Sequence, residues 1–377
     1  MILKLSPIRT ISPSEPPPIR LNSYRFLCIG ECWFGSDARA AFAALRRLGN
    51  SVDVIDQNNY LPDWHGTFSR AIRKFLRPLF VRELTGETLQ RIKRFKPDCL
   101  FVFKGNWVQA EVIKSCRKQR ITTIVYYPDV SFLSHGPYIP QSLPLFDRVF
   151  TAKSYGVGDM QSQLDVRNIS FLEPGFDPEL HRPVMLSDED SATYGCDVAF
   201  IGTWSPKKES LLVSLRRALP TIKLKIWGFQ WKENCDPELG NSVMGYGVTG
   251  DDYTKAICGS AICLGLLSEI GLGASSGDLI TARTFQIPAC GTFMLHERNS
   301  EVLRYFDEGR DAEFFDSPEE LAQKVSYYLA HDKEREVITQ NGLQRSQRDD
   351  YSIDNRMRSV LRWLSSHLDA KATTARA

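Results

Sequence analysis

Short apolar runs alternate with longer amphipathic segments along the first half of the chain. Such runs predict buried strands, and the segments between them predict helices with one apolar face. The strands are expected at Tyr24–Ile29, Ser51–Ile55, Pro97–Phe103, Ile121–Tyr127, Asp147–Ala152 and Asn168–Leu172. The helices are expected at Asp37–Leu48, Phe68–Phe95 and Val108–Arg117. Strands that alternate with helices predict a parallel sheet with helices on its faces.

The same alternation begins again after residue 195. The strands of this second half are expected at Asp197–Ile201, Ile222–Trp227, Ala261–Leu267 and Thr292–Leu295. The helices are expected at Pro206–Ala218, Asp251–Ala256, Leu279–Ala289, Glu319–Leu329 and Lys333–Arg348. Near the end, an apolar stripe from Ile353 to Leu364 predicts one more helix, which should pack back toward the first half.

Irregular, proline-containing stretches divide the chain. Residues 1–22 form a proline-rich arm that is expected to be disordered, and residues 181–195 are expected to be a linker. The linker holds the acidic run Asp188–Asp190, which we interpret as a solvated hinge and not as a metal site. The predicted organisation is therefore a first domain at 23–180, a second at 196–348, a closing helix at 349–368 and a tail at 369–377.

Composition narrows the class of protein. The chain has 377 residues, with 42% hydrophobic and 24% charged residues, as in globular proteins. The formal net charge of +2 gives no bulk attraction to nucleic acid, and no apolar run reaches the length of a transmembrane helix. The basic clusters around Arg73 and Lys93 favour solvated helix faces, with peripheral membrane contact as the alternative. Nine scattered cysteines without a C-x-x-C pair favour a reducing, cytoplasmic location.

The segment Ile262–Gly291, ICLGLLSEIGLGASSGDLITARTFQIPACG, holds the strongest candidate chemistry. Its small residues Ser275, Ser276 and Gly277 follow a predicted strand, and small residues let backbone N–H groups approach a phosphate. Asp278 is a good N-cap for the helix expected at Leu279–Ala289. A strand, a glycine-rich loop and a helix in this order predict a nucleotide-phosphate site.

Two other interpretations of the glycine-rich segment remain open. The glycines could serve only to make a tight turn between a strand and a helix. Alternatively, the protein could be an NAD-binding oxidoreductase, with Glu297 as the acid that binds a ribose. Against this second interpretation, Gly271, Gly273 and Gly277 miss the G-x-G-x-x-G spacing by one residue.

The second half resembles a known family. The stretch Ala282–Gly309, ARTFQIPACGTFMLHERNSEVLRYFDEG, is similar to the CgeB-like (spore-maturation-type) glycosyltransferases, which are related to family 4 enzymes. Phe200–Trp204, FIGTW, and Lys225–Phe229, KIWGF, add to the resemblance. It implies the GT-B fold, in which two Rossmann-like domains face each other across a cleft.

The resemblance also implies a reaction. The donor would be a nucleotide-sugar, either a UDP-sugar or a GDP-sugar, and no metal cofactor would be required. The acceptor would be a glycan, a lipid-linked molecule or a protein, in the synthesis of surface polysaccharide or glycoconjugates. No nucleic-acid partner is implied.

The family carries two carboxylates eight positions apart, one near the donor sugar and one near the ribose. Here these positions hold Asp278 and Gln286, and both depart from a pair of glutamates. Glutamine keeps an acceptor oxygen without the charge, so a catalytically inactive GT-B-like binding protein is an alternative. Arg283 lies one helical turn before Gln286 and could reach the diphosphate.

Further donor-site residues are expected at the carboxyl ends of strands in the second half. These candidates are Gly202, Thr203, Trp204, Trp227, Gly228 and Tyr246. Lys207 or Lys208 could neutralise charge on the leaving diphosphate.

On the acceptor side, the segment Tyr126–His135, YYPDVSFLSH, follows a predicted strand and holds Asp129 and His135. An inverting enzyme needs a base for the acceptor hydroxyl, and Asp129 is the expected base. A retaining enzyme would need none, and this loop would then only position sugars.

Overall fold

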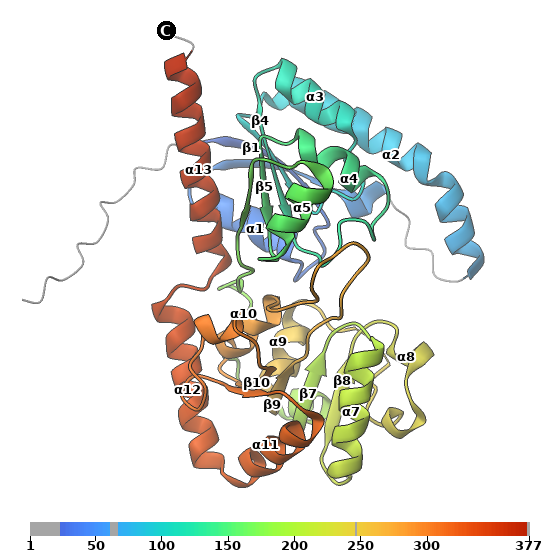
Figure 1. Cartoon of the computed structure of the whole chain (residues 1–377), viewed down its shortest axis with the longest axis vertical. Helices are drawn as coiled ribbons and strands as arrows, with labels where there is room; N and C mark the ends of the chain where they lie inside the picture. The colour runs from blue at the N-terminus through green and yellow to red at the C-terminus, as the bar shows by residue number, and fades with distance from the viewer. Residues whose placement is uncertain (1–22, 61–66, 246, 375–377) are drawn as a thin grey trace, which may run out of the picture.

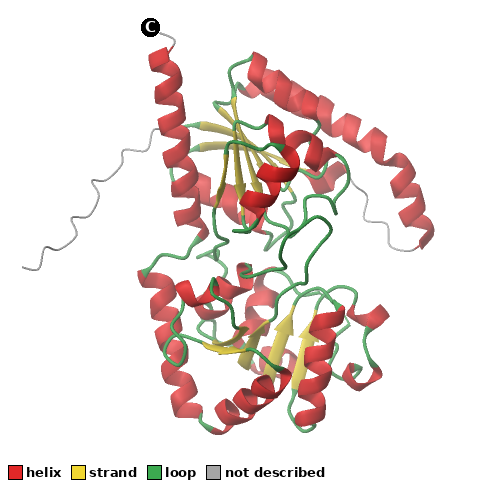
Figure 2. Cartoon of the chain, viewed as in Figure 1, coloured by secondary structure: helices red, strands yellow, loops and turns green. Residues whose placement is uncertain are grey.

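The computed structural model describes residues 23–60, 67–245 and 247–374, and the predicted arm at 1–22 lies outside them. Figure 1 shows two α/β domains stacked along the long axis of the molecule. Each domain is built on its own parallel sheet, as Figure 2 shows. The predicted α/β architecture of two parallel-sheet domains is confirmed.

The first domain holds a six-stranded sheet with the order β2-β1-β3-β4-β5-β6. The strands are β1 (Arg25–Gly30), β2 (Ser51–Asp56), β3 (Cys99–Phe103), β4 (Thr122–Tyr127), β5 (Arg148–Thr151) and β6 (Ile169–Phe171). The helices are α1 (Asp37–Arg47), α2 (Thr67–Phe95), α3 (Ala110–Lys118), α4 (Tyr138–Ser142) and α5 (Gly156–Leu164). Apolar side chains form a separate core on each face of this sheet, as parallel sheets require.

The second domain holds a five-stranded sheet with the order β11-β10-β9-β7-β8. The strands are β7 (Cys196–Ile201), β8 (Leu224–Trp227), β9 (Ser260–Gly265), β10 (Phe293–Glu297) and β11 (Glu313–Phe315). The helices are α6 (Asp188–Tyr194), α7 (Pro206–Ala218), α8 (Trp231–Asn234), α9 (Gly250–Cys258), α10 (Ala282–Ala289), α11 (Pro318–Ala330) and α12 (Asp332–Arg348). This sheet also has a core on each face.

The last helix, α13 (Ile353–Thr374), returns to the first domain. Met357, Val360, Leu361 and Leu364 pack in the same core as α1, and Figure 1 shows α13 beside the first sheet. The helix continues through Thr374, beyond the point where a frayed tail was expected. None of the described helices is long and apolar enough to cross a membrane.

Two further expected elements differ from the structure. The expected linker at 181–195 contains α6, which is capped by Ser187 and joined to the second domain by an ion pair of 2.9 Å between Asp190 and Lys255. The acidic run therefore forms the first turn of a helix, where negative charge is stabilising. The helix expected from Leu279 begins instead at Ala282, with Thr281 as its N-cap.

Candidate functional site

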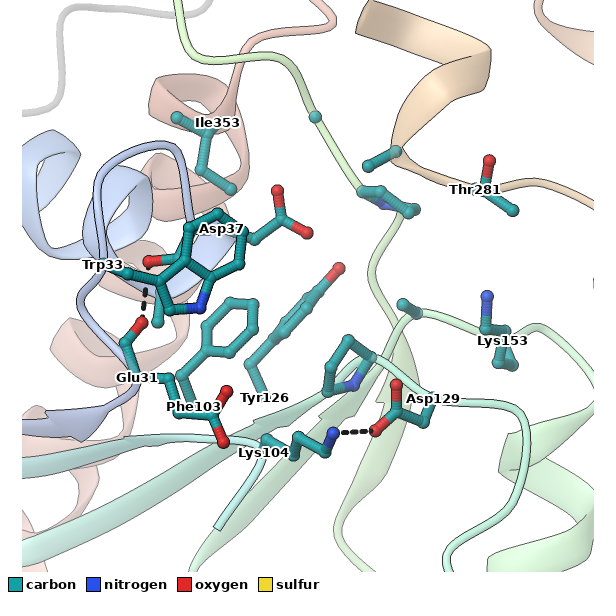
Figure 3. Close-up of a pocket in the computed structure, with 17 residues that line it drawn as sticks. Glu31, Trp33, Asp37, Phe103, Lys104, Tyr126, Asp129, Lys153, Thr281 and Ile353 are labelled. Atoms are coloured by element: carbon teal, nitrogen blue, oxygen red, sulfur yellow. Dashed lines mark hydrogen bonds and ion pairs between the residues drawn. The ribbon is translucent and has the colours of Figure 1, made fainter. Parts of the chain in front are cut away.

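A cavity of about 310 Å³ lies between the two domains (Figure 3). Most of its wall comes from loops at the carboxyl ends of β1, β3, β4 and β5, where open parallel sheets place ligands. The second domain contributes Thr281 and Ala282 at the start of α10. We call this space the first cavity.

A second cavity, of about 270 Å³, lies against the second domain. Its wall includes the carboxyl ends of β7 and β8 and the start of α9. Helix α10 contributes Ala282, Arg283 and Gln286. Three residues, Trp33, Asp37 and Ala282, line both cavities, so the two spaces adjoin at these residues.

The first turn of α10 therefore lies where the cavities meet. The first backbone N–H groups of a helix have no partner within the helix and carry its positive dipole end. They provide a binding site for an anion such as a diphosphate. A phosphate site at the start of this helix stays a prediction, and the helix starts later than expected, at Ala282.

A buried hydrogen-bond chain fixes this end of α10. The Thr281 N–H donates to the Thr284 hydroxyl oxygen at 3.0 Å, and that oxygen lies 3.0 Å from His296 Nε2. His296 Nδ1 lies 2.7 Å from the Glu297 carbonyl oxygen, which can only accept, so the ring hydrogen is on Nδ1. Burial lowers the pKa of His296 to about 4, which keeps the ring neutral as an acceptor for the threonine hydroxyl.

Arg283 forms part of the second cavity wall. Its guanidinium donates to the Leu266 carbonyl oxygen at 3.0 Å and lies 5.6 Å from the centre of the Phe200 ring. A Cβ at Gly202 would lie 3.0 Å from a guanidinium nitrogen of Arg283. Glycine at 202 therefore leaves the arginine room beside the strand end. Thr203 and Gly228, also predicted, line the same cavity.

Gln286 is at the wall of the second cavity and is only 5% exposed. Its side-chain oxygen accepts a hydrogen bond of 2.6 Å from the Tyr253 hydroxyl. The His181 ring packs edge-on against Tyr253 and lines the cavity too. His181 Nδ1 accepts from the Asp177 N–H at 2.9 Å, and burial lowers its pKa to about 3. His181 is therefore neutral at physiological pH, with its hydrogen on Nε2.

Asp129 lines the first cavity, as expected for a residue that follows β4. Its carboxylate forms an ion pair of 2.9 Å with Lys104 and lies 3.5 Å from His135 Nε2. The other ring nitrogen of His135 lies 3.3 Å from the Tyr127 hydroxyl. The structure thus brings Asp129 and His135 together, but His135 does not line the cavity and Asp129 is already paired.

Lys207 is not at either cavity, which corrects the prediction. Its ammonium group pairs with Glu297 at 2.5 Å, in a separate hollow beside Arg298. The neighbouring Lys208 is buried and donates to the Thr203 carbonyl oxygen at 3.3 Å. Burial and the Arg283 charge lower the pKa of Lys208 to about 8. Of the two lysines considered, Lys208 contacts a residue that lines the second cavity, Thr203.

The glycine-rich loop between β9 and α10 differs most from its prediction. Ser275, Ser276 and Gly277 line neither cavity. Instead the loop contacts the first domain: the Ser275 N–H donates to the Asp159 carboxylate at 2.9 Å, and Gln163 donates to the Gly273 carbonyl oxygen at 2.6 Å. A Cβ at Gly277 would lie 2.5 Å from the Ser268 carbonyl oxygen, so this glycine closes the loop on itself.

Asp278 holds the base of the same loop. Its carboxylate pairs with Lys153 of the first domain at 2.5 Å and accepts from the Ser268 N–H at 3.3 Å. Burial by itself would raise the pKa of Asp278, but the Lys153 charge, the hydrogen bonds from Lys153 and Ser268 and the Arg283 charge together outweigh burial, and the pKa is lowered. Because the carboxylate has these partners, it does not cap α10, and it lines neither cavity.

Three aromatic residues were predicted at the donor site, and the structure places neither of the two that it describes at the wall of either cavity. Trp227 is 0% exposed and belongs to the core between the second sheet and its helices, so it cannot border a base. Trp204 packs against the core on the other face of that sheet and lines neither cavity. Tyr246 lies outside the described residues.

The structure adds residues that the sequence analysis did not select. Trp33 and Asp37 come from the segment after β1, and Phe229 follows β8; Trp33 is 47% exposed and Phe229 is 66% exposed. A signal for the first two was present, because Gly30 and Gly35 mark the carboxyl end of the first strand. The sequence pattern predicts Asp37 only as the first residue of a helix.

Asp37 has a distinctive electrostatic setting. Removal from solvent raises its pKa to about 6, and the carboxylates of Asp129 and Asp177 add to the rise. Lys153 and Arg283 oppose it. Across the described residues, no group of three or more histidine, cysteine or acidic side chains is arranged to hold a metal ion. All nine cysteines are described, and none forms a disulfide.

Comparison with known proteins agrees with this geometry. Residues 207–362 match a protein family described as glycosyl transferase-like. No curated protein sequence matches the chain. The family match covers most of the second domain and confirms the predicted class of enzyme, a glycosyltransferase.

Solved structures resemble the whole chain. A glycosyltransferase from Rickettsia africae ESF-5 has a TM-score of 0.62 at 13% identity, over 92% of this chain and 99% of that one. Sucrose-phosphate synthase from Thermosynechococcus elongatus has a TM-score of 0.63 at 13% identity, over 91% of this chain and 100% of that one. Anabaena HepE, solved in complex with UDP-glucose, has a TM-score of 0.60 at 13% identity, over 91% of this chain and 100% of that one. These similarities confirm the GT-B fold.

Proposed function

We propose that this protein transfers a sugar from a nucleoside diphosphate donor to an acceptor hydroxyl. The nucleoside occupies the second cavity, the diphosphate lies at the start of α10 beside Arg283, and the acceptor enters through the first cavity. One observation carries the proposal: Ala282, at the positive end of α10, lines both cavities. A leaving diphosphate bound there is stabilised by groups that are already in place.

The second cavity also suits a nucleoside. The exposed rings of Phe229 and Trp33 offer faces on which a base can stack. Gln286 lies at the wall with an acceptor oxygen, and the neutral ring of His181 adds a donor. These groups support the predicted ribose role of Gln286, with UDP-sugars and GDP-sugars as the donors to test.

The finer features of the function are also proposals. We propose a CgeB-like enzyme that acts without a metal cofactor, because Arg283 and the helix terminus can supply the positive charge. The acceptor is a glycan, a lipid-linked molecule or a protein, in the synthesis of surface polysaccharide or glycoconjugates. The cytoplasmic location and the peripheral membrane contact, expected from the cysteines and the basic clusters, stay predictions.

Of the two alternative functions, the structure disfavours an NAD-binding oxidoreductase but not a binding protein without catalysis. An NAD-binding oxidoreductase would use the glycine-rich loop for the pyrophosphate, but Gly277 and its neighbours line neither cavity. The proposed ribose acid of that alternative, Glu297, accepts from the Leu267 N–H and pairs with Lys207. A binding protein without catalysis remains the second candidate, because Gln286 carries no charge.

Isothermal titration calorimetry with UDP, GDP, ADP and NAD tests the proposal. We expect UDP or GDP to bind with micromolar affinity and NAD to bind far more weakly. Arg283→Ala should weaken nucleotide binding by about tenfold or more, since a charged hydrogen bond to phosphate contributes roughly 1.5–3 kcal/mol. Arg304→Ala, at an exposed position that lines neither cavity, is the matched control. Equal binding of all four ligands, or none, would contradict the proposal.

A further inference from the structure

Two cysteines meet at the far ends of the two helices that wall the second cavity. Helix α9 ends at Cys258, and Cys290 is the C-cap of α10. Both helices begin at the cavity, where Gly250 and Ala282 line the wall. The Cys258 thiol donates to the Cys290 carbonyl oxygen at 3.4 Å and is hydrogen-bonded to the Cys290 thiol as well. The two thiols therefore lie side by side, and both are free in this structure.

Further hydrogen bonds join the same two helices. Next to the cavity, the Tyr253 hydroxyl of α9 donates to the Gln286 side chain of α10 at 2.6 Å. Beyond the far end of α10, the Thr292 hydroxyl donates to the Ile257 carbonyl oxygen at 3.2 Å. The Cys290 N–H donates to the Gln286 carbonyl oxygen at 3.0 Å, so one helical turn links the cysteine to a residue of the cavity wall. A displacement of Cys290 would therefore reach the second cavity.

Cys258 is the more reactive thiol of the pair. All nine cysteines are described, and Cys258 is the one whose pKa is lowered, whereas burial raises the pKa of the others. The hydrogen bond with Cys290 lowers it most, and the Val184 N–H and the Arg182 charge add to the effect against burial. Peroxides react with the thiolate form. Because Cys258 is half-buried and Cys290 is only 1% exposed, an oxidant reaches Cys258 first.

We propose that Cys258 and Cys290 are a modification site: a peroxide oxidises Cys258, Cys290 closes a disulfide bond with it, and this bond weakens nucleotide binding in the second cavity. The effect on binding rests on the proposed function, whereas the disulfide does not. A disulfide bond is about 2.05 Å long, shorter than the contact between two reduced thiols, so its formation draws the ends of α9 and α10 together. In a reducing compartment such a bond forms under oxidant and is reversed by thiols.

The oxidation needs one peroxide and no other reactant. The Cys258 thiolate attacks one oxygen of hydrogen peroxide, the O–O bond breaks, and the electron pair leaves with hydroxide, which gains the thiol proton to give water. The product is a sulfenic acid on Cys258. The Cys290 sulfur then attacks the Cys258 sulfur, the S–O bond breaks, and the hydroxide leaves with the Cys290 proton as a second water. The two thiols lose two electrons, which reduce the peroxide.

Peptide mapping of the whole chain tests the disulfide. The reduced protein is treated with hydrogen peroxide, its remaining thiols are blocked, and it is digested with trypsin without a reductant. Trypsin cleaves after Lys255, Arg283 and Arg298, so the linked product should join the peptides 256–283 and 284–298. Mass spectrometry should detect this product in the oxidised protein and lose it after treatment with dithiothreitol.

Three variants locate the chemistry. Cys258→Ser should abolish the linked product, which distinguishes Cys258 from Cys263 on the same peptide. Cys290→Ser should leave a sulfenic acid on Cys258, which dimedone traps. Cys235→Ser, at another half-buried cysteine, is the matched control and should keep the product. The proposal is overturned if the wild type gives no linked product, or if the product persists in Cys258→Ser.

Calorimetry with UDP and GDP measures the effect of the disulfide on binding. The oxidised wild type should bind its nucleotide at least about fivefold more weakly than the reduced protein, as is typical of coupled sites, and dithiothreitol should restore the affinity. Peroxide should leave the affinity of Cys258→Ser unchanged. A linked protein that binds as tightly as the reduced one overturns the proposed effect on binding. If the reduced wild type binds neither nucleotide, the proposed function fails instead, and the peptide map still decides the disulfide.

Discussion

Two loops cross between the domains in opposite directions, and they make different use of their acidic residues. The segment after β1 reaches the second domain, where Gly35 and Phe34 lie close to Gly250. A Cβ at Gly250 would overlap the Phe34 ring. The segment after β9 reaches the first domain through Ser275 and Gly273. Each follows a strand at the carboxyl edge of its sheet, so position in the fold alone does not distinguish them.

The two loops differ in what their carboxylates contact. Asp37, at the end of the first loop, lines both cavities and has no hydrogen bond or ion pair within the described part of the chain. Asp278, at the end of the second loop, is buried against Lys153 and lines neither cavity. A paired, buried carboxylate holds two domains together, whereas an unpaired one in a cavity can act on a ligand. The difference favours a structural role for Asp278 and leaves Asp37 available to a ligand in the cavities.

Removal of the buried pair should give the largest effect on stability. Lys153→Met leaves the Asp278 carboxylate buried without its partner, which typically costs about 3–5 kcal/mol of the free energy of unfolding. Lys104→Met breaks the more exposed pair with Asp129 and should cost about 1 kcal/mol or less. Urea unfolding of both variants gives the two values. Equal losses would mean that Asp278 does not hold the domains together.

The two carboxylates should also give opposite dependences of stability on pH. The pKa of Asp37 is raised in the folded protein, so its ionisation destabilises the fold as pH rises from about 4 to 6. Asp37→Asn should therefore be more stable than the wild type above pH 6, by about 2 kcal/mol, and equal below pH 4. The pKa of Asp278 is lowered, so Asp278→Asn should be less stable at pH 7, with a difference that shrinks as pH falls below 4.

Melting temperatures of these two variants between pH 3.5 and 8 provide the measurement. Asp369→Asn serves as the control for removal of an exposed charge. If both variants changed the melting temperature at neutral pH in the same direction, the contrast between the unpaired Asp37 and the paired Asp278 would be wrong.

A pair of glycine variants separates the two loops in another way. Gly277→Ala places a Cβ 2.5 Å from the Ser268 carbonyl oxygen, and such overpacking costs roughly 1–3 kcal/mol. The loss should appear in the melting temperature, while nucleotide affinity of the folded protein stays within about threefold. Gly202→Ala presses on Arg283 in the second cavity and should weaken nucleotide binding. If calorimetry showed that Gly277→Ala weakens nucleotide binding more than Gly202→Ala does, the glycine-rich loop would again be the candidate phosphate site.

Most of the fold could be predicted from the sequence because each sheet is buried on both faces. Runs such as Cys99–Phe103 and Cys196–Ile201 must then be continuously apolar, and the helices between them must show one apolar face. Several residues that line the second cavity were predicted, because their position depends only on local order along the chain. Gly202, Thr203 and Gly228 follow strands, and Arg283 and Gln286 lie in the helix after the glycine-rich loop.

The remaining features depend on contacts between residues that are far apart in the sequence, which no local pattern reports. Asp278 looks like an N-cap until Lys153, far away in the sequence, takes its carboxylate, and α10 then begins at Ala282. Trp227 looks like a ring at a strand end until helices cover it on the second sheet. Asp37 looks like an ordinary first residue of a helix, but the Arg283 charge of the second domain is near enough to affect its pKa.

The smallest predicted effect concerns Gln286, the other residue of the aligned pair. Its side-chain oxygen accepts from the Tyr253 hydroxyl at 2.6 Å, and the residue lines the second cavity. If it also contacts the ribose, Gln286→Glu supplies a charged acceptor and should tighten nucleotide binding by about fivefold, or roughly 1 kcal/mol. Gln286→Ala should weaken binding by a similar factor, since it removes the acceptor.

Tyr253→Phe tests whether the tyrosine orients that oxygen. Loss of its hydroxyl frees the Gln286 side chain to rotate and should weaken nucleotide binding by less than Gln286→Ala does. Titration of the preferred nucleotide against the wild type and the three variants gives the four dissociation constants. Four equal constants would show that Gln286 supports only the wall of the cavity. The aligned pair would then have no role in donor binding, and Asp37 and Arg283 would remain as the charged groups of the site.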